Sequence, residues 1–253
     1  MWQRTKRKQI PEWIARVRSR LAELRAADPT LRMFGTFMHQ YRLGPPLAQS
    51  EITAAETHYQ ISISPEYRDF LLHIGNGGAG PGYGLQRFGV LTTPVIRRNP
   101  APTVVMDRDG GVGPINEFAD CFDELYFNEM ERLINDRSPL ARPFPLTRPW
   151  TLNDRDIPDD DYAYFQWDIN VREPMFKHGS VELSDQGCGQ KHKLVVTGDE
   201  SGSVWVFDEQ DGEYISPYGA GMLPDDAIPR RYTFAEWYED WLIDYLHNAR
   251  NAT

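Results

Sequence analysis

The chain has few cysteines, no long hydrophobic run and no internal repeats. Its two cysteines, Cys121 and Cys188, are too few and too far apart for a disulfide framework, which is typical of a reducing compartment. No apolar run approaches the roughly 18 residues that a membrane span requires. The apolar stretch of a signal peptide does not follow the basic N-terminus, so we expect a soluble, cytoplasmic protein.

Basic residues are outnumbered by acidic residues outside the N-terminal segment. The net charge is −10, yet residues 1–43 contain ten lysines and arginines against three acids. That segment is therefore +7, and residues 44–253 carry −17. An acidic body repels the phosphates of nucleic acid and favours a basic protein partner. We therefore expect a protein partner and no binding of nucleic acid.

The first part of the chain shows helical patterns. Apolar residues at helical spacing predict a helix over 11–27, whose other face is basic. We expect that face to be solvated or to lie on the protein's own acidic body, although RNA, a membrane surface or an acidic partner are alternatives. Further helices are predicted over 50–59, with Ser50 as the N-cap, and over 64–74. Residues 84–91 have the pattern of a strand.

The second part of the chain contains both weak and strong secondary-structure patterns. Residues 118–134 have helical spacing, residues 137–160 are rich in Pro, Asp and Arg and predict a long loop, and residues 162–167 suit a buried strand. Two β-rich runs, 193–197 and 203–208, predict a hairpin with a five-residue turn.

The C-terminal helix has the clearest pattern. Thr233 and Glu236 form the capping-box pair that begins a helix. The apolar residues that follow keep helical spacing and form a wide stripe: Phe234, Trp237, Tyr238, Trp241, Leu242, Tyr245 and Leu246. A stripe this wide must pack on another part of the protein, so we assign it to the core rather than to a ligand platform.

Three segments occur in a recognisable order: residues 64–71 running into 76–84, residues 187–189 leading to 194–198 and 202–205, and residues 234–242. Together they resemble the SUKH superfamily, which contains the yeast cell-wall assembly regulator (Smi/Knr-like) domain and many bacterial immunity proteins. The residues of these motifs are Asn76, Gly77, Gly78, Gly80, Pro81, Gly82, Tyr83, Gly84, Gly198, Gly202, Trp205, Trp237 and Trp241.

The resemblance implies a single α+β domain over residues 47–246, with a central, mainly antiparallel sheet flanked by helices. Residues 1–46 are then a basic helical extension with a linker, residues 99–170 contain an insertion, and residues 247–253 form a tail. The resemblance also implies binding rather than catalysis. Bacterial members of the family protect the producing cell from a toxin, and the family names no catalytic residues.

Three short motifs resemble cofactor-binding, catalytic or metal-binding sequences, but each is better explained by a structural role. Residues 75–80 match the dinucleotide pattern G-x-G-x-x-G, but a helix precedes them, so we interpret them as a helix-to-strand turn. Residues 198–202 lack the spacing of a serine-hydrolase elbow and are expected to form a hairpin tip. Cys188 and His192 offer two of the four ligands of a closed zinc site, so we expect Cys188 to be a small buried thiol.

Acidic residues are the candidates for partner contact. The aspartates at 107, 109 and 159–161 do not continue into a calcium-loop spacing, so we expect no metal and no cofactor. We interpret these acids as solvated residues or as part of an acidic surface that attracts a basic toxin. The acids at or near the predicted hairpin are the ones that we expect to contact a partner: Asp199, Glu200, Asp208, Glu209, Asp211, Asp225 and Asp226.

We therefore expect a non-enzymatic immunity protein that binds and neutralises a cognate bacterial toxin. The alternative is a protein–protein interaction scaffold or regulatory module of the same fold, which binds several partners at modest affinity. An enzyme is the third hypothesis, but spacing alone assembles no nucleophile, base and electrophile.

Overall fold

The computed structural model describes residues 10–89, 104–106, 112–114, 138–152, 157–158, 167, 171–209, 213–219 and 230–251. The chain divides into two compact units. One is Val90–Arg137, in which β1 (Val104–Met106) and β2 (Val112–Pro114) form an antiparallel pair. The other consists of Met1–Gly89 and Ser138–Thr253, and it contains the large sheet and the described helices.

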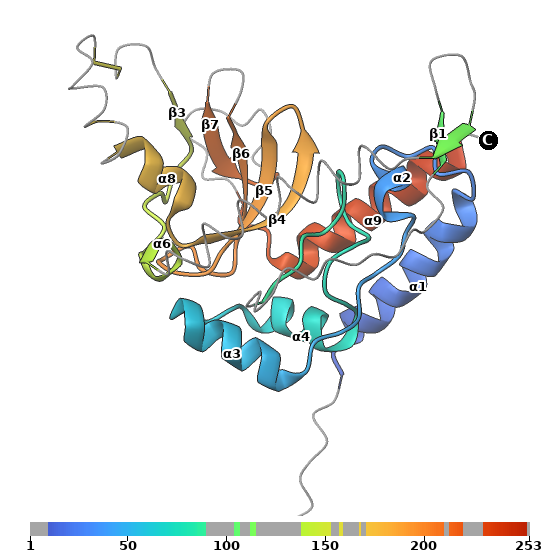
Figure 1. Cartoon of the computed structure of the whole chain (residues 1–253), viewed down its shortest axis with the longest axis horizontal. Coiled ribbons are helices and arrows are strands. Elements are labelled where there is room, and N and C mark those ends of the chain that lie inside the picture. The colour runs from blue at the N-terminus through green and yellow to red at the C-terminus, as the bar shows by residue number, and fades with distance from the viewer. Residues whose placement is uncertain are drawn as a thin grey trace, which may run out of the picture. The chain divides into compact units, whose positions relative to one another are not determined.

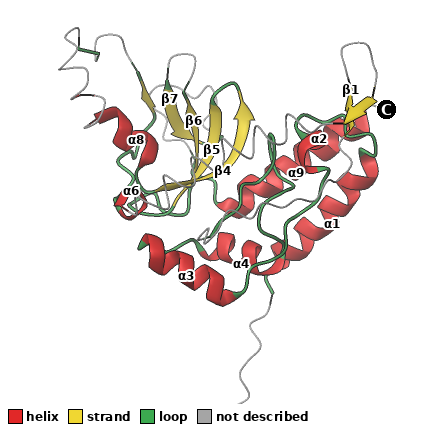
Figure 2. Cartoon of the chain, in the orientation of Figure 1, coloured by secondary structure: helices red, strands yellow, loops and turns green. Residues whose placement is uncertain are grey.

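The larger unit confirms the predicted α+β class, with a central antiparallel sheet flanked by helices (Figure 1). Figure 2 shows the strands of this sheet in one layer and the helices of the larger unit outside it. Its helices are α1 (Glu12–Ala27), α2 (Thr36–His39), α3 (Gln49–Tyr59), α4 (Pro65–His73), α6 (Ser138–Ala141), α8 (Glu173–Lys177) and α9 (Phe234–Asn251). Its strands are β3 (Trp150–Thr151), β4 (Ser180–Gly187), β5 (Gln190–Val195), β6 (Val204–Asp208) and β7 (Tyr214–Pro217).

The sheet has the order β3-β7-β6-β5-β4, and every neighbouring pair is antiparallel. The predicted hairpin is confirmed as β5 and β6, paired from Gln190 with Asp208 to Leu194 with Val204. Successive side chains of β6 point to opposite faces. Trp205 and Phe207 therefore share one face, where they pack with Ile215 and with two phenylalanines from outside the sheet, Phe144 and Phe176.

The other face of the sheet meets α9, whose aromatic stripe lies in the core as predicted. Trp237 donates its indole N–H to Nδ1 of His192 on β5 at 3.1 Å. The capping box is also confirmed, because the Thr233 and Glu236 side chains accept each other's backbone N–H groups at 3.3 and 3.0 Å. On the side away from the sheet, Phe234 packs on Phe70 of α4 with 5.0 Å between ring centroids.

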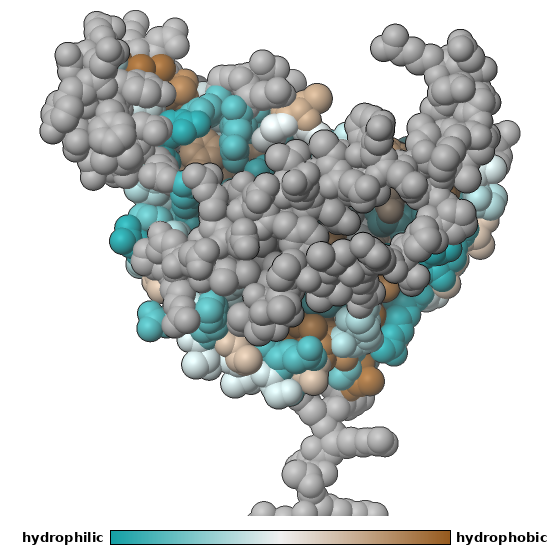
Figure 3. Space-filling view, viewed as in Figure 1, coloured by the Kyte–Doolittle hydropathy of each residue, from teal (hydrophilic) through white to brown (hydrophobic). Residues whose placement is uncertain are grey.

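The predicted N-terminal helix is confirmed as α1, and it docks on α9. Its apolar stripe is buried, and Glu239 of α9 accepts hydrogen bonds from Arg16 at 2.9 Å and from Arg20 at 2.7 Å. The outer side of α1 is hydrophilic (Figure 3). The basic helix thus pairs with the protein's own acids, and the described part of residues 1–46 belongs to the same unit as the sheet.

The glycine-rich segment after α4 is a turn, as predicted. Gly77 and Gly78 have φ angles of 78° and 98°, which favour glycine. A Cβ atom on Gly78 would lie 2.3 Å from the backbone oxygen of Arg42, so the chain also needs glycine there for close approach. Asn76 closes the turn, because its side-chain amide donates to the Phe88 carbonyl at 2.8 Å and accepts the Phe88 N–H at 2.7 Å.

The strand predicted over 84–91 is wrong as a regular strand within the residues described. Residues 83–86 run beside β4, where the Tyr83 N–H donates to the Asp185 carbonyl at 2.9 Å and the Gln86 N–H donates to the Leu183 carbonyl at 2.7 Å. Only Leu85 forms bridges, to Gly78 and Ser184. Glycines with φ of 111° at position 84 and 146° at position 89 interrupt the extended backbone on both sides.

The start of α3 is also corrected. Ala48, not Ser50, is the N-cap residue, and the Glu51 carboxylate accepts the Ala48 backbone N–H at 2.6 Å. Because a glutamate three residues after the cap satisfies that amide, the helix begins ahead of the serine. The loop predicted over 137–160 likewise contains α6 and β3 within its described residues.

Cys188 is exposed, so the prediction of a small buried thiol is wrong. It lies at the tip of the β4–β5 hairpin, and Cys188 and Gly189 have φ angles of 50° and 77°. Such a two-residue turn directs its side chains to solvent. The predicted helix over 118–134, Cys121, the aspartates at 107, 109 and 159–161, and the predicted strand over 162–167 except Trp167 lie outside the described residues.

Candidate functional site

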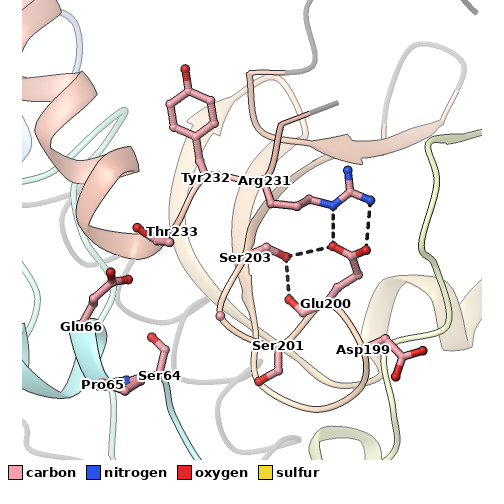
Figure 4. Close-up of a pocket in the computed structure, with 11 residues that line it drawn as sticks. Ser64, Pro65, Glu66, Asp199, Glu200, Ser201, Ser203, Arg231, Tyr232 and Thr233 are labelled. Carbon is pink, nitrogen blue, oxygen red and sulfur yellow. Dashed lines mark hydrogen bonds and ion pairs between the residues drawn. The ribbon is translucent and has the colours of Figure 1, made fainter. Parts of the chain in front are cut away.

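A pocket of about 400 Å³ opens between the start of α4, the β5–β6 turn and the segment that leads into α9 (Figure 4). The residues that line it are Ser64, Pro65, Glu66, Asp199, Glu200, Ser201, Gly202, Ser203, Arg231, Tyr232 and Thr233. Two of the predicted partner-binding acids, Asp199 and Glu200, thus lie at this pocket.

The Glu200 side chain forms an ion pair with an arginine of the same chain. Arg231 donates to the Glu200 carboxylate at 2.5 and 3.0 Å (Figure 4). The same guanidinium donates to the Thr147 carbonyl at 2.7 Å. Ser203 donates its hydroxyl to the Glu200 carbonyl at 2.6 Å and accepts the indole N–H of Trp205 at 2.9 Å. The ion pair between Glu200 and Arg231 therefore links the β5–β6 turn to the segment before α9. Asp199, beside Glu200, is exposed.

The pocket's described lining provides hydroxyls, carboxylates and the guanidinium of Arg231, without an imidazole, thiol or amine. Ser64 accepts the Tyr67 backbone N–H as the N-cap of α4, so its oxygen serves the helix. Burial raises the pKa of Glu66, and the nearby Glu236 carboxylate adds to the shift. This arrangement suits hydrogen bonding to a polar chain that docks from outside.

A second polar surface runs along the α9 side of the sheet, from Asp208 at the end of β6 to Tyr218 beside Val204. Strand register places Gln190, Asp208 and Tyr214 side by side across β5, β6 and β7. The Gln190 amide donates to the Tyr214 hydroxyl at 2.9 Å, which confirms that they share a face. We call this surface the polar sheet face; its residues, each half-buried, are Gln190, Asp208, Tyr214, Ser216 and Tyr218.

Helix α9 adds two carboxylates to the polar sheet face. The Tyr218 hydroxyl donates to Asp240 at 2.8 Å, and Asp244 follows one helical turn later on the same side. Burial raises the pKa of Tyr218 far above its ordinary value, and the charges of Asp240 and Asp244 reinforce the shift. Tyr218 therefore stays a neutral donor beside two negative charges.

The structure divides the predicted partner-binding acids into two groups. Asp199 and Glu200 lie at the β5–β6 turn, and Asp208 and Glu209 lie at the other end of β6, roughly 15 Å away for a strand of this length. Glu209 lies 3.9 Å from the ammonium of Lys191, which also pairs with Glu182 at 3.5 Å. Asp211, Asp225 and Asp226 lie outside the described residues.

Sequence reasoning missed Asp240 and Asp244. Both flank the aromatic stripe of α9, and their positions three and seven residues after Trp237 were the available signal. The spacing placed them on one side of the helix, but only the packing of α9 on the sheet shows that this side meets Tyr218.

The three motif segments contact one another. Tyr238 of α9 donates its hydroxyl to the Ala79 carbonyl at 2.7 Å, and Tyr83 bonds to β4 through its backbone. Ser203 and Thr233 form an isolated bridge that joins the hairpin to the start of α9. The first and third segments therefore meet at α9, whereas Trp205 of the second segment packs on the opposite face of the sheet.

No protein-family model matches this chain, and no curated protein matches it. Within the described part of the chain, no three or more histidine, cysteine, aspartate or glutamate side chains are grouped so as to hold a metal ion. None of the described helices has both the length and the hydrophobicity to cross a membrane.

Proposed function

We propose that this chain is an immunity protein, a non-enzymatic protein of the cytoplasm that binds a toxin and neutralises it. One observation carries the proposal: on a body that carries −17 over residues 44–253, Asp240 and Asp244 lie beside Tyr218 on the same sheet face as Asp208. The resemblance of the motif segments to the SUKH superfamily supports the same function.

The partner that this charge favours is a basic protein domain. Negative potential on one face speeds association with a positive partner and repels the phosphates of nucleic acid. Many toxins act on nucleic acid and need a positive active face, so an acidic protein that covers such a face blocks the activity. Catalysis by the bound complex is not required for protection.

The test begins with capture of tagged chain from its native host at low and at high salt, with partners read by mass spectrometry. We expect one dominant partner that contains a toxin domain, and we expect salt to weaken the complex because it screens exposed charges. The partner is then expressed alone and together with this chain. Growth arrest that the chain relieves, through a one-to-one complex of the purified proteins, is the predicted result.

Two outcomes count against immunity. Several weak partners, none of them toxic, would identify a scaffold or regulatory module instead. Turnover of a substrate by the purified chain, abolished by a single point substitution, would identify an enzyme.

A further inference from the structure

We infer that the polar sheet face, the two α9 carboxylates and a neighbouring group of aromatic residues form one surface, which binds a cationic protein segment rich in arginine. This inference rests on the proposal that the chain is a binding protein. It names the part of the surface that binds and the chemistry of the segment that it takes.

The aromatic group, here called the aromatic rim, consists of Phe34, Phe37 and Tyr83. The rings of Phe34 and Phe37 lie 5.3 and 6.4 Å from the Tyr83 ring, centroid to centroid. Phe34 is 54% exposed and Phe37 is 49% exposed. Folding gains little from two phenylalanines left half in water, whereas exposed aromatic clusters are typical of contacts between proteins.

The aromatic rim is held in place by the core. Tyr245 of α9 donates its hydroxyl to the Phe34 carbonyl at 3.0 Å, and the Tyr83 backbone is bonded to β4. Gly35 has a φ of 73°, and a Cβ atom there would lie 1.8 Å from the Gly82 carbonyl oxygen. A rim that is ordered before binding loses little conformational freedom when a partner docks.

The aromatic rim borders the polar sheet face. A Cβ atom on Gly187 would lie 3.1 Å from the Tyr83 hydroxyl, and Gly187 pairs with Gln190, a member of the polar sheet face. On α9 the charge of Asp244 acts on Tyr245, whose hydroxyl bonds to the rim. Gln190 and Asp244 therefore connect the polar sheet face and α9 to the aromatic rim.

The charges of this surface select a cation. The two lysines of β5, Lys191 and Lys193, lie on the opposite face, where the Lys193 ammonium is 4.5 Å from the centre of the Phe207 ring. The polar sheet face and α9 contribute Asp208, Asp240 and Asp244 instead. Arginine suits such a surface best, because its planar guanidinium bonds carboxylates in pairs and stacks on aromatic rings.

The test uses a fluorescein-labelled octa-arginine peptide as the probe, with octaglutamate as the negative probe, and measures anisotropy in about 0.15 M salt. Asp244→Lys is the main variant, because Asp244 is exposed and its replacement does not disturb the core. Asp199→Lys is the matched control, since it makes the same change of charge at an exposed position at the other end of the sheet.

We expect Asp244→Lys to weaken octa-arginine binding about tenfold and Asp199→Lys by no more than about twofold. Phe37→Ala, which leaves the net charge unchanged, should weaken binding about fivefold. Equal losses in the two lysine variants would overturn the inference, because binding would then follow net charge alone. No loss in Asp244→Lys would overturn it as well, and thermal unfolding of each variant checks that it is folded.

Failure of this inference is distinguishable from failure of the proposed function. If Asp244→Lys still protects cells from the toxin and binds it as the unsubstituted chain does, the function stands and the surface is wrong. If no toxin partner exists but octa-arginine binding follows the predicted order, the surface stands and the partner is a basic protein of another kind.

Discussion

Acid should loosen the packing of α9 on the sheet by protonating His192. Nδ1 of this histidine accepts the indole N–H of Trp237, which requires an unprotonated Nδ1. Its ring also lies edge-on to the ring of Tyr218, with 5.1 Å between centroids. Protonation would bury a charge and remove the acceptor of the bond between α9 and β5.

The sign and size of the effect follow from the pKa. Burial lowers the pKa of His192 from 6.5 to about 4, so the unfolded chain takes up a proton more readily than the folded one. The stability that depends on the neutral ring is complete above pH 6.5 and is lost as the pH falls towards 4. Between pH 7 and pH 5 the free energy of unfolding should fall by about 2 kcal/mol from this group.

His39 should contribute in the same direction. Burial lowers its pKa to about 4, an effect that a hydrogen bond to the Gly80 backbone partly opposes, and its Nδ1 accepts the Tyr41 backbone N–H at 3.0 Å. Together the two histidines make the folded unit sensitive to mild acid. Because α9 supplies Asp240 and Asp244 to the polar sheet face, partner binding should weaken over the same range.

The assay is urea unfolding at pH 7, 6 and 5 for the unsubstituted chain, His192→Asn and His247→Asn. Asparagine keeps an acceptor for Trp237 but does not titrate, so His192→Asn should lose less stability on acidification by about 2 kcal/mol. His247 is exposed, so His247→Asn is the matched control for a histidine-to-asparagine change outside the core. The reasoning is refuted if His192→Asn and the unsubstituted chain lose equal stability between pH 7 and pH 5.

Three further substitutions test the fold around the candidate surfaces. Glu239→Gln should lower the free energy of unfolding in urea by about 1 kcal/mol, because the Glu239 carboxylate accepts hydrogen bonds from two arginines of α1. Glu23→Gln, at the exposed pair with Arg250, is its control and should change little. Gly78→Ala should cost about 2 kcal/mol or more by the same measurement, given the 2.3 Å approach of a Cβ atom to a backbone oxygen; an unchanged midpoint would contradict that contact. Cys188→Ser should remove a rapidly reacting thiol that Ellman's reagent detects in the folded chain, since Cys188 is exposed; persistence of that fast phase in the variant would show that the thiol is elsewhere.

Sequence alone determined the elements whose patterns are local. The cap of α4, the capping box and stripe of α9, the β5–β6 hairpin and the turn after α4 all follow from residues within a few positions of one another. The periods of 3.6 and 2 that mark helices and strands are properties of the chain itself, so they can be read before any packing is known.

Only the tertiary structure decided which acids share a face. Asp199 and Asp208 are near in sequence but lie at opposite ends of β6, whereas Asp208 and Asp240 come from distant segments that share one face. Strand register and the docking of α9 through Trp237 and His192 set those neighbours, and both depend on contacts between residues far apart in the chain. The charge of the sequence favours a basic partner, whereas packing decides which face presents Asp208, Asp240 and Asp244.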